Sequence, residues 1–102
     1  MAKRVTLVTF ILPPPLRRWV NGRVEVRVFA VAASDHGFPT LGGALDTLRR
    51  AHPSLEERLR DEDGHLKRHI TLYVCGANAD GLGGLECALP SGAQVHVLPA
   101  LV

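Results

Sequence analysis

The chain has little aromatic character and almost no excess of charge of either sign. Aromatic residues make up 5% of its 102 residues, and 12 basic against 10 acidic side chains leave a formal net charge of +2. Nucleic-acid binding normally requires a basic face with aromatic side chains for base stacking. The composition therefore predicts no nucleic-acid partner.

Long apolar runs are also lacking. No segment approaches the roughly 18 apolar residues that a membrane-spanning helix requires, so we expect no membrane insertion. The apolar run at residues 5–12 follows Lys3 and Arg4 as the core of a signal peptide would. Prolines interrupt it, however, and no small-residue cleavage site follows. We interpret the run as a strand and expect a cytoplasmic protein.

Cysteine is scarce as well. Cys75 and Cys87 are too few to form a disulfide framework. They do not form a CxxC pair, and no neighbouring residue is an obvious stabiliser of a thiolate. Redox activity or sulfur binding is the alternative interpretation, but we expect two ordinary half-buried cysteines.

The length predicts one domain, residues 1–102, and the first third of it reads as two strands. Residues 5–12 are β-branched and apolar on both faces, which is typical of a central strand. Residues 23–30 alternate, with Val24, Val26 and Val28 expected to point inward. Because Asn-Gly at positions 21 and 22 is a strong turn signal, we expect a hairpin with a wide loop.

The middle of the chain predicts one main helix. Thr40 is a suitable N-cap, apolar residues follow at helical spacing from Leu41 to Ala51, and Pro53 ends the pattern. Ser54 and Glu57 fit a capping box for a second, short helical turn. Further strands are expected at residues 69–75 and 94–98, with room for a very short strand within residues 77–85.

This order of elements predicts an α+β fold. A helix with a single apolar stripe must cover one face of a sheet. With the first and last strands side by side at the centre, the arrangement is a β-grasp (ubiquitin-like) fold. Its sheet would be mixed and four- to five-stranded, with one main helix packed on one face.

Several segments, in this order, resemble motifs of the MoaD/ThiS family of ubiquitin-like sulfur carriers, and most closely the MoaD-like and cysteine-biosynthesis carriers. They are the helix at residues 40–48 with its following turn, ITLYVCG at 70–76, GGL at 83–85, LPSGAQV at 89–95 and LPAL at 98–101. The motifs cover most of the chain, and their order and spacing are specific together although each is weak alone. Cys75 departs from the family pattern, which has Asn there, and the printed sequence does not contain the two terminal glycines of such carriers.

The resemblance implies a non-enzymatic carrier without a cofactor of its own. In such carriers an E1-like adenylylating enzyme of the MoeB/ThiF type activates the terminal glycine carboxylate, and sulfur then replaces AMP to give a thiocarboxylate. A sulfur-acceptor enzyme, such as the molybdopterin synthase large subunit or a cysteine-synthase-like protein, uses that sulfur. The tail would comprise Pro99, Ala100, Leu101 and Val102. Glycines are needed beyond it because only residues without Cβ give the backbone the freedom to thread a narrow channel.

Two alternatives stay open for the end of the chain. In the first, the natural chain continues past Val102 with the glycines and transfers sulfur. In the second, it ends there and is a Gly-Gly-less β-grasp binding module that acts by non-covalent protein–protein interaction. In both, the predicted partner-binding residues are Leu98, His96 and Tyr73, because Leu98 should face outward just before the tail. The competing interpretation packs Leu98 under the loop at residues 13–19.

No other group of residues predicts catalysis or metal binding. His65 and His69 are four apart, but a glycine and a strand in this region remove the helical context that would make them metal ligands. Residues 61–63 read as a charged turn. The glycines at 81–84 lack the helix and the Lys-Ser/Thr of a phosphate loop. We predict no catalytic residue and no metal site.

Overall fold

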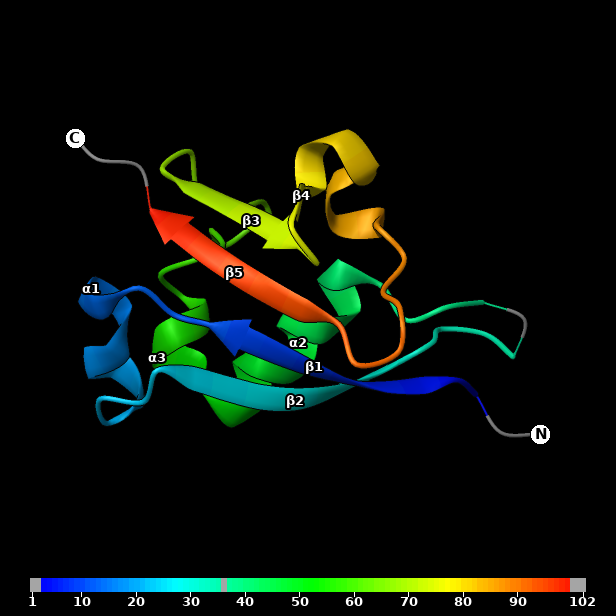
Figure 1. Cartoon of the computed structure of the whole chain (residues 1–102), viewed down its shortest axis with the longest axis horizontal. Coiled ribbons are helices and arrows are strands. Elements are labelled where there is room, and N and C mark those ends of the chain that lie inside the picture. Colours follow the sequence, from blue (N-terminus) through cyan, green and yellow to red (C-terminus); the bar gives the residue numbers. More distant parts are fainter. Residues whose placement is uncertain (1–2, 36, 100–102) are drawn as a thin grey trace.

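The computed structural model, which describes residues 3–35 and 37–99, places one sheet in front of two helices (Figure 1). Short 3₁₀ helices, labelled η, fill some of the connections. The elements in chain order are β1 Val5–Ile11, α1 Pro14–Arg17, η1 Arg18–Val20, β2 Glu25–Val31, α2 Leu41–Ala51, α3 Pro53–Glu56, β3 Ile70–Val74, β4 Ala77–Asn78, η2 Ala79–Leu82, η3 Gly84–Glu86 and β5 Gln94–Pro99.

The sheet has the strand order β2-β1-β5-β3-β4. β1 runs antiparallel to β2, with Val8 opposite Val28, and parallel to β5, with Phe10 opposite Val95. β5 runs antiparallel to β3 over five residue pairs. The first and last strands are therefore neighbours inside a mixed five-stranded sheet, which confirms the predicted β-grasp fold.

α2 covers one face of this sheet and supplies much of the core. Thr40 caps the helix as predicted, because its Oγ1 accepts the N–H of Gly43 at 3.1 Å. Leu41, Leu45 and Leu48 are fully buried. Burying a leucine side chain contributes roughly 1.5–3 kcal/mol, so these three positions hold the helix on the sheet. Ala51, at the end of the predicted stripe, is exposed.

The opposite face of the sheet is open along β1, which is a central strand as predicted. Thr6, Val8, Phe10 and Leu12 are buried, whereas Val5 and Leu7 are exposed although they are apolar. The reason is that the helices pack on one side only (Figure 1). Val24 was expected to point inward, but it precedes β2 and is 53% exposed.

The connection between the first two strands is helical rather than a wide loop. α1 begins with Pro14, which is tolerated there because the first N–H groups of a helix have no intrahelical partner. Asn21 and Gly22 follow with φ angles of 57° and 80°, so the predicted Asn-Gly turn is present. It turns the chain from η1 into β2.

The capping box predicted for the second helix does not form. α3 starts at Pro53, the N-cap position is His52, and no side chain caps it. A proline at the first position pre-sets the helical backbone, and the helix starts two residues earlier than a capping box at Ser54 and Glu57 would start it. In the described part of the chain, no helix has the length and apolar character needed to cross a membrane.

A buried ionic network joins α2 to α3. Glu56 is 1% exposed, and it accepts a hydrogen bond from Nε of Arg60, which is 8% exposed. Arg60 Nη2 also donates to Asp46 Oδ1 at 2.8 Å, and Arg49 Nε lies 3.5 Å from Glu56 Oε2. Burial opposes the charge of Arg60, but the hydrogen bonds to Asp46 and Glu56 outweigh it and raise its pKa. Glu56 therefore has cationic partners on both oxygens.

Replacing Glu56 should make the protein unfold more easily, because the buried Arg60 guanidinium then loses its buried carboxylate partner. We expect Glu56→Ala to lower the free energy of unfolding by about 3–5 kcal/mol in urea titrations. The matched control is Glu25→Ala, which removes the exposed ion pair with Arg27 and should cost less than about 1 kcal/mol. Equal losses in the two variants would contradict the assignment.

Candidate functional site

The candidate site is the carboxyl-terminal half of β5, which alternates between the core and the open face. Val95 and Val97 are buried and anchor the strand. His96 is half-buried, and Leu98 is 46% exposed on the other side. The predicted outward orientation of Leu98 is thus confirmed, and the competing interpretation, in which a loop covers it, is wrong.

β3 brings Tyr73 to this surface. The register places Tyr73 directly opposite His96 and Thr71 opposite Leu98. Residues opposite each other on antiparallel strands point to the same face, with Cβ atoms roughly 5 Å apart. Thr71, Tyr73, His96 and Leu98 form one continuous surface, here called the β3–β5 strip. The three predicted partner-binding residues therefore lie together, and their role in binding stays a prediction.

The strip ends where the predicted tail begins. Pro99 is the last residue of β5, pairs with Ile70 of β3 and is half-buried. Ala100, Leu101 and Val102 lie outside the described residues. The root of the tail is therefore a strand held in the middle of the sheet, between β1 and β3 (Figure 1).

A buried threonine fixes the other end of β5. Thr6 Oγ1 donates to the carbonyl oxygen of Pro90 at 3.2 Å and accepts the N–H of Gly92 at 2.9 Å. The Thr9 N–H donates to Ala93 O at 3.0 Å. These bonds tie the turn before β5 to β1, so they set the register of the strand that carries the strip. Sequence patterning missed this role of Thr6 because its partners are more than eighty residues away.

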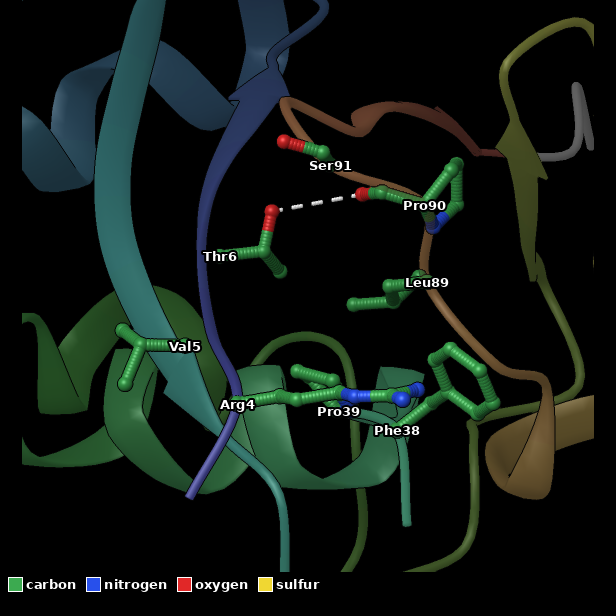
Figure 2. Close-up of a pocket in the computed structure, with 8 residues that line it drawn as sticks. All are labelled: Arg4, Val5, Thr6, Phe38, Pro39, Leu89, Pro90 and Ser91. Atoms are coloured by element: carbon green, nitrogen blue, oxygen red, sulfur yellow. Dashed lines mark hydrogen bonds between the residues drawn. The ribbon is translucent and has the colours of Figure 1, made fainter. Parts of the chain in front are cut away.

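The same turn forms one wall of a pocket of about 480 Å³ (Figure 2). Arg4, Phe38 and Leu89 are among its lining residues, and the guanidinium of Arg4 lies 4.1 Å from the centre of the Phe38 ring. Arg4 is the one charged residue of the lining, so no acid–base pair converges there. The pocket lies at the start of β5, away from Pro99, and supplies no catalytic set.

An apolar patch on the open face was not predicted. Val5 lies opposite Val31 and Leu7 lies opposite Phe29, and all four side chains are exposed. The signal for this patch is the alternation of β1 and β2, because the outward residues of two paired strands lie side by side on an open face. Val5 and Leu7 precede Thr9, the residue of β1 at which the pairing with β5 begins. The patch is therefore separate from the β3–β5 strip.

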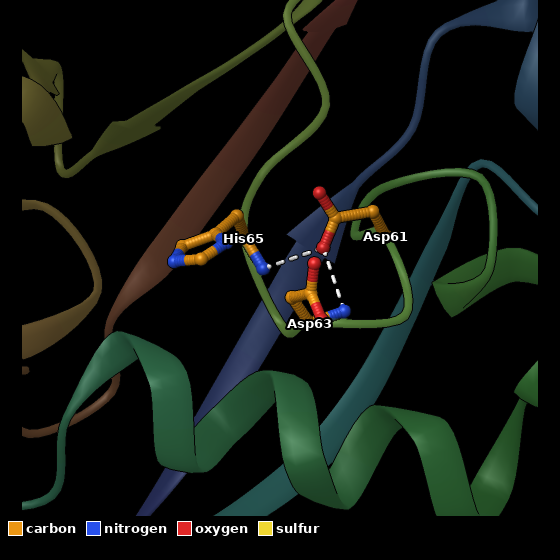
Figure 3. A group of neighbouring side chains, drawn as sticks. All are labelled: Asp61, Asp63 and His65. Atoms are coloured by element: carbon orange, nitrogen blue, oxygen red, sulfur yellow. Dashed lines mark hydrogen bonds between the residues drawn. The ribbon is translucent and has the colours of Figure 1, made fainter.

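The acidic turn at residues 61–65 is a local structural device. Asp61, Asp63 and His65 are exposed, and the side-chain atoms that could ligate a metal ion lie within 4.8 Å of one another (Figure 3). Asp61 Oδ1 accepts the N–H groups of His65 at 3.0 Å and of Asp63 at 2.9 Å. These bonds, that to His65 foremost, lower the pKa of Asp61. The carboxylate closes the turn, in line with the prediction of a charged turn.

The two cysteines differ from the expectation of two half-buried thiols. Cys75 is exposed and Cys87 is 4% exposed. Cys75 lies in the turn after β3, outside the core, whereas Cys87 belongs to the core cluster. Alternation in the preceding strand correctly predicted the inward residues up to Val74 but carries no information about the turn.

Known proteins were then compared with the chain. No family model matches it. Sulfur carrier protein CysO of Mycobacterium tuberculosis is 32% identical over 96 residues, which cover 92% of this chain and 95% of that protein. The crystal structure of Mycobacterium tuberculosis CysO matches with a TM-score of 0.72, covering 92% of this chain and 99% of that one.

Two further structures agree with this match. A chain in the crystal structure of the Amycolatopsis orientalis BexX/CysO complex has a TM-score of 0.76 at 29% identity, covering 93% of this chain and 97% of its own length. Small archaeal modifier protein 1 of Haloferax volcanii has a TM-score of 0.71 at 33% identity, covering 93% and 96%. Both have the five-stranded architecture in common with this chain over nearly its whole length.

The Asp61 turn generates a pH-dependent prediction. Because the pKa of Asp61 is lower when folded, its stabilising effect is present above the unfolded value of 3.8 and is lost as the pH falls through the folded value. Asp61→Ala should therefore unfold at lower urea concentration than the wild type at neutral pH, and the difference should shrink in acid. Glu62→Ala, in the same exposed turn, is the control. A difference that does not change with pH would show that the charge of Asp61 plays no part.

Proposed function

The chain belongs to the ubiquitin-like sulfur-carrier family, and we propose that it donates sulfur from a thiocarboxylate formed on its C-terminal tail. CysO is a carrier and not an enzyme, and the chain has the same character. What supports the finer proposal is the position of β5. This strand pairs with β1 as far as His96 and with β3 as far as Pro99, so the segment that follows starts from a strand held in the sheet.

The proposed chemistry takes place in two steps on a partner enzyme. An E1-like adenylylating enzyme of the MoeB/ThiF type joins the tail carboxylate to the AMP part of ATP and releases pyrophosphate. A sulfide-level sulfur donor then attacks the acyl carbon, the C–S bond forms and AMP leaves. In this proposal the carrier supplies only the tail carboxylate, and the partner enzyme supplies any acid or base.

We propose that partner enzymes dock on the β3–β5 strip. Leu98 offers an exposed apolar side chain next to the root of the tail, and Tyr73 and His96 extend that surface across two strands. An enzyme that covers the strip would also hold Pro99 in place, because His96 and Leu98 of the strip lie on β5, the strand that ends at Pro99. The acceptor would be an enzyme such as the molybdopterin synthase large subunit or a cysteine-synthase-like protein.

The alternative is a β-grasp binding module that uses the same strip without transferring sulfur. The exposed Leu98 supports this alternative equally, because a non-covalent partner would use the same apolar contact. The two functions differ in whether the residues after Pro99 are needed for chemistry.

Intact mass spectrometry separates the two functions. The natural gene product should be co-expressed with its E1-like enzyme and analysed without proteolysis. We expect a fraction of the protein to gain the mass difference between one sulfur and one oxygen, located at the C-terminal carboxylate. A mature chain that ends at Val102 and never gains this mass would overturn the carrier mechanism and favour the binding module.

Docking on the strip can be tested with Leu98→Asp, which places a charge at an exposed position and should leave the fold intact. We expect at least about tenfold weaker binding to the E1-like enzyme in calorimetry. Val24→Asp is the matched control, because Val24 is equally exposed but lies outside the strip. Unchanged affinity of Leu98→Asp would exclude the strip as the docking surface. If deletion of Leu101 and Val102, and not Leu98→Asp, abolished partner binding, the binding-module alternative would fail.

A further inference from the structure

Both cysteines of the chain line a single pocket. The pocket has a volume of about 480 Å³ and lies where the end of β3 meets the segment after η3. Its other lining residues are mostly small or apolar: Val74, Ala77, Leu82, Ala88 and Pro90. In Figure 1 the end of β3, β4 and the yellow-to-orange η2–η3 segment lie together at the β4 edge of the sheet. The two thiol-bearing residues therefore border one largely apolar pocket.

Cys75 is not explained by the turn that contains it. Val74 pairs with Ala77, so Cys75 and Gly76 form a two-residue hairpin loop between β3 and β4. Both have positive φ angles, 49° and 88°. Such a turn favours Asn-Gly, whereas a cysteine is strained in the left-handed region. Asparagine would fit this backbone conformation with less strain than cysteine. The geometry of the turn therefore does not explain why a thiol is present at this position.

Hydrogen bonds hold Cys87 in place on another side of the pocket lining. Its carbonyl oxygen accepts the N–H of Leu41 at 3.0 Å, at the start of α2, and its Sγ donates to Ala88 O at 3.4 Å. Burial, and secondarily the neighbouring Cys75, raise the pKa of the Cys87 thiol. Cys87 therefore stays protonated, and the exposed Cys75 is the sulfur that an oxidant reaches first.

We propose that Cys75 and Cys87 form an oxidation site that closes an intramolecular disulfide across this pocket. A peroxide takes two electrons from the Cys75 thiolate, which becomes a sulfenic acid as hydroxide leaves. The sulfur of Cys87 then attacks the sulfur of Cys75, the S–S bond forms, and water is released with the Cys87 proton. A dithiol reductant restores both thiols.

The bond would fasten the β3–β4 turn to the segment that meets α2. It lies at the end of β5 opposite the tail, since the Cys75 N–H donates to Gln94 O at 2.8 Å while Pro99 ends the strand. Oxidation should therefore stabilise the fold without covering the β3–β5 strip. This thiol chemistry does not depend on the proposed sulfur transfer, and the readouts below do not involve the tail.

The test treats the folded protein with hydrogen peroxide at low protein concentration, then denatures and alkylates it. We expect a monomer lighter by two hydrogens, with no alkylated cysteine and a linked Cys75–Cys87 peptide. Its melting temperature should exceed that of the reduced protein by about 5 °C or more, because the cross-link restricts the unfolded chain. A dithiol reductant should reverse both changes.

Two variants separate the disulfide from other effects of oxidation. Cys75→Asn suits the turn, should fold at least as stably as the reduced wild type, and should show no stabilisation by peroxide. In Cys87→Ala, peroxide should carry Cys75 on to the sulfinic acid. The proposal is overturned if Cys87 of the wild type remains open to alkylation after Cys75 has been oxidised, or if only disulfide-linked dimers form.

Discussion

The parallel pairing of β1 with β5 is the constraint on which the rest of the structure depends. It places the first and last strands of the described chain side by side, so the chain between them must cross from β2, on one side of this pair, to β3 on the other. α2 makes that crossing and covers one face, and the Glu56–Arg60 network fastens α3 to it. Thr6 and Thr9 hold the start of β5 in register. The same pairing makes β5, the strand that ends at Pro99, a central strand of the sheet.

Much of this could be predicted from the sequence, because the signals are local. The apolar stripe from Leu41 to Leu48 and the inward residues of β3 follow from periodicity. The N-cap of α2 depends on one local hydrogen bond, which Thr40 Oγ1 accepts. The connection at residues 13–22 and the start of α3 were mistaken, because prolines can begin a short helix as readily as they end a strand. The exposure of Val5 and Leu7 depends on which face of the sheet the helices cover. The sequence of one strand does not determine that face.

The candidate site was predictable to a similar degree and for the same reason. Alternation around Val95 and Val97 places Leu98 on the outer face, whereas its proximity to Tyr73 requires the pairing of β3 with β5. The shared pocket of Cys75 and Cys87 could not be predicted, since a turn and an irregular segment bring the two together. Contacts of this kind depend on the path of the backbone and not on the pattern of apolar residues.

The bonds from Thr6 to the Pro90–Gly92 turn also have a consequence for the order of synthesis. A growing chain carries β1 long before β5 exists, so the centre of the sheet has a vacant position until the last strand leaves the ribosome. Contacts over such sequence distances form late and slow folding. The strip on β5 therefore takes its native form only after the other strands of the described sheet have been synthesised.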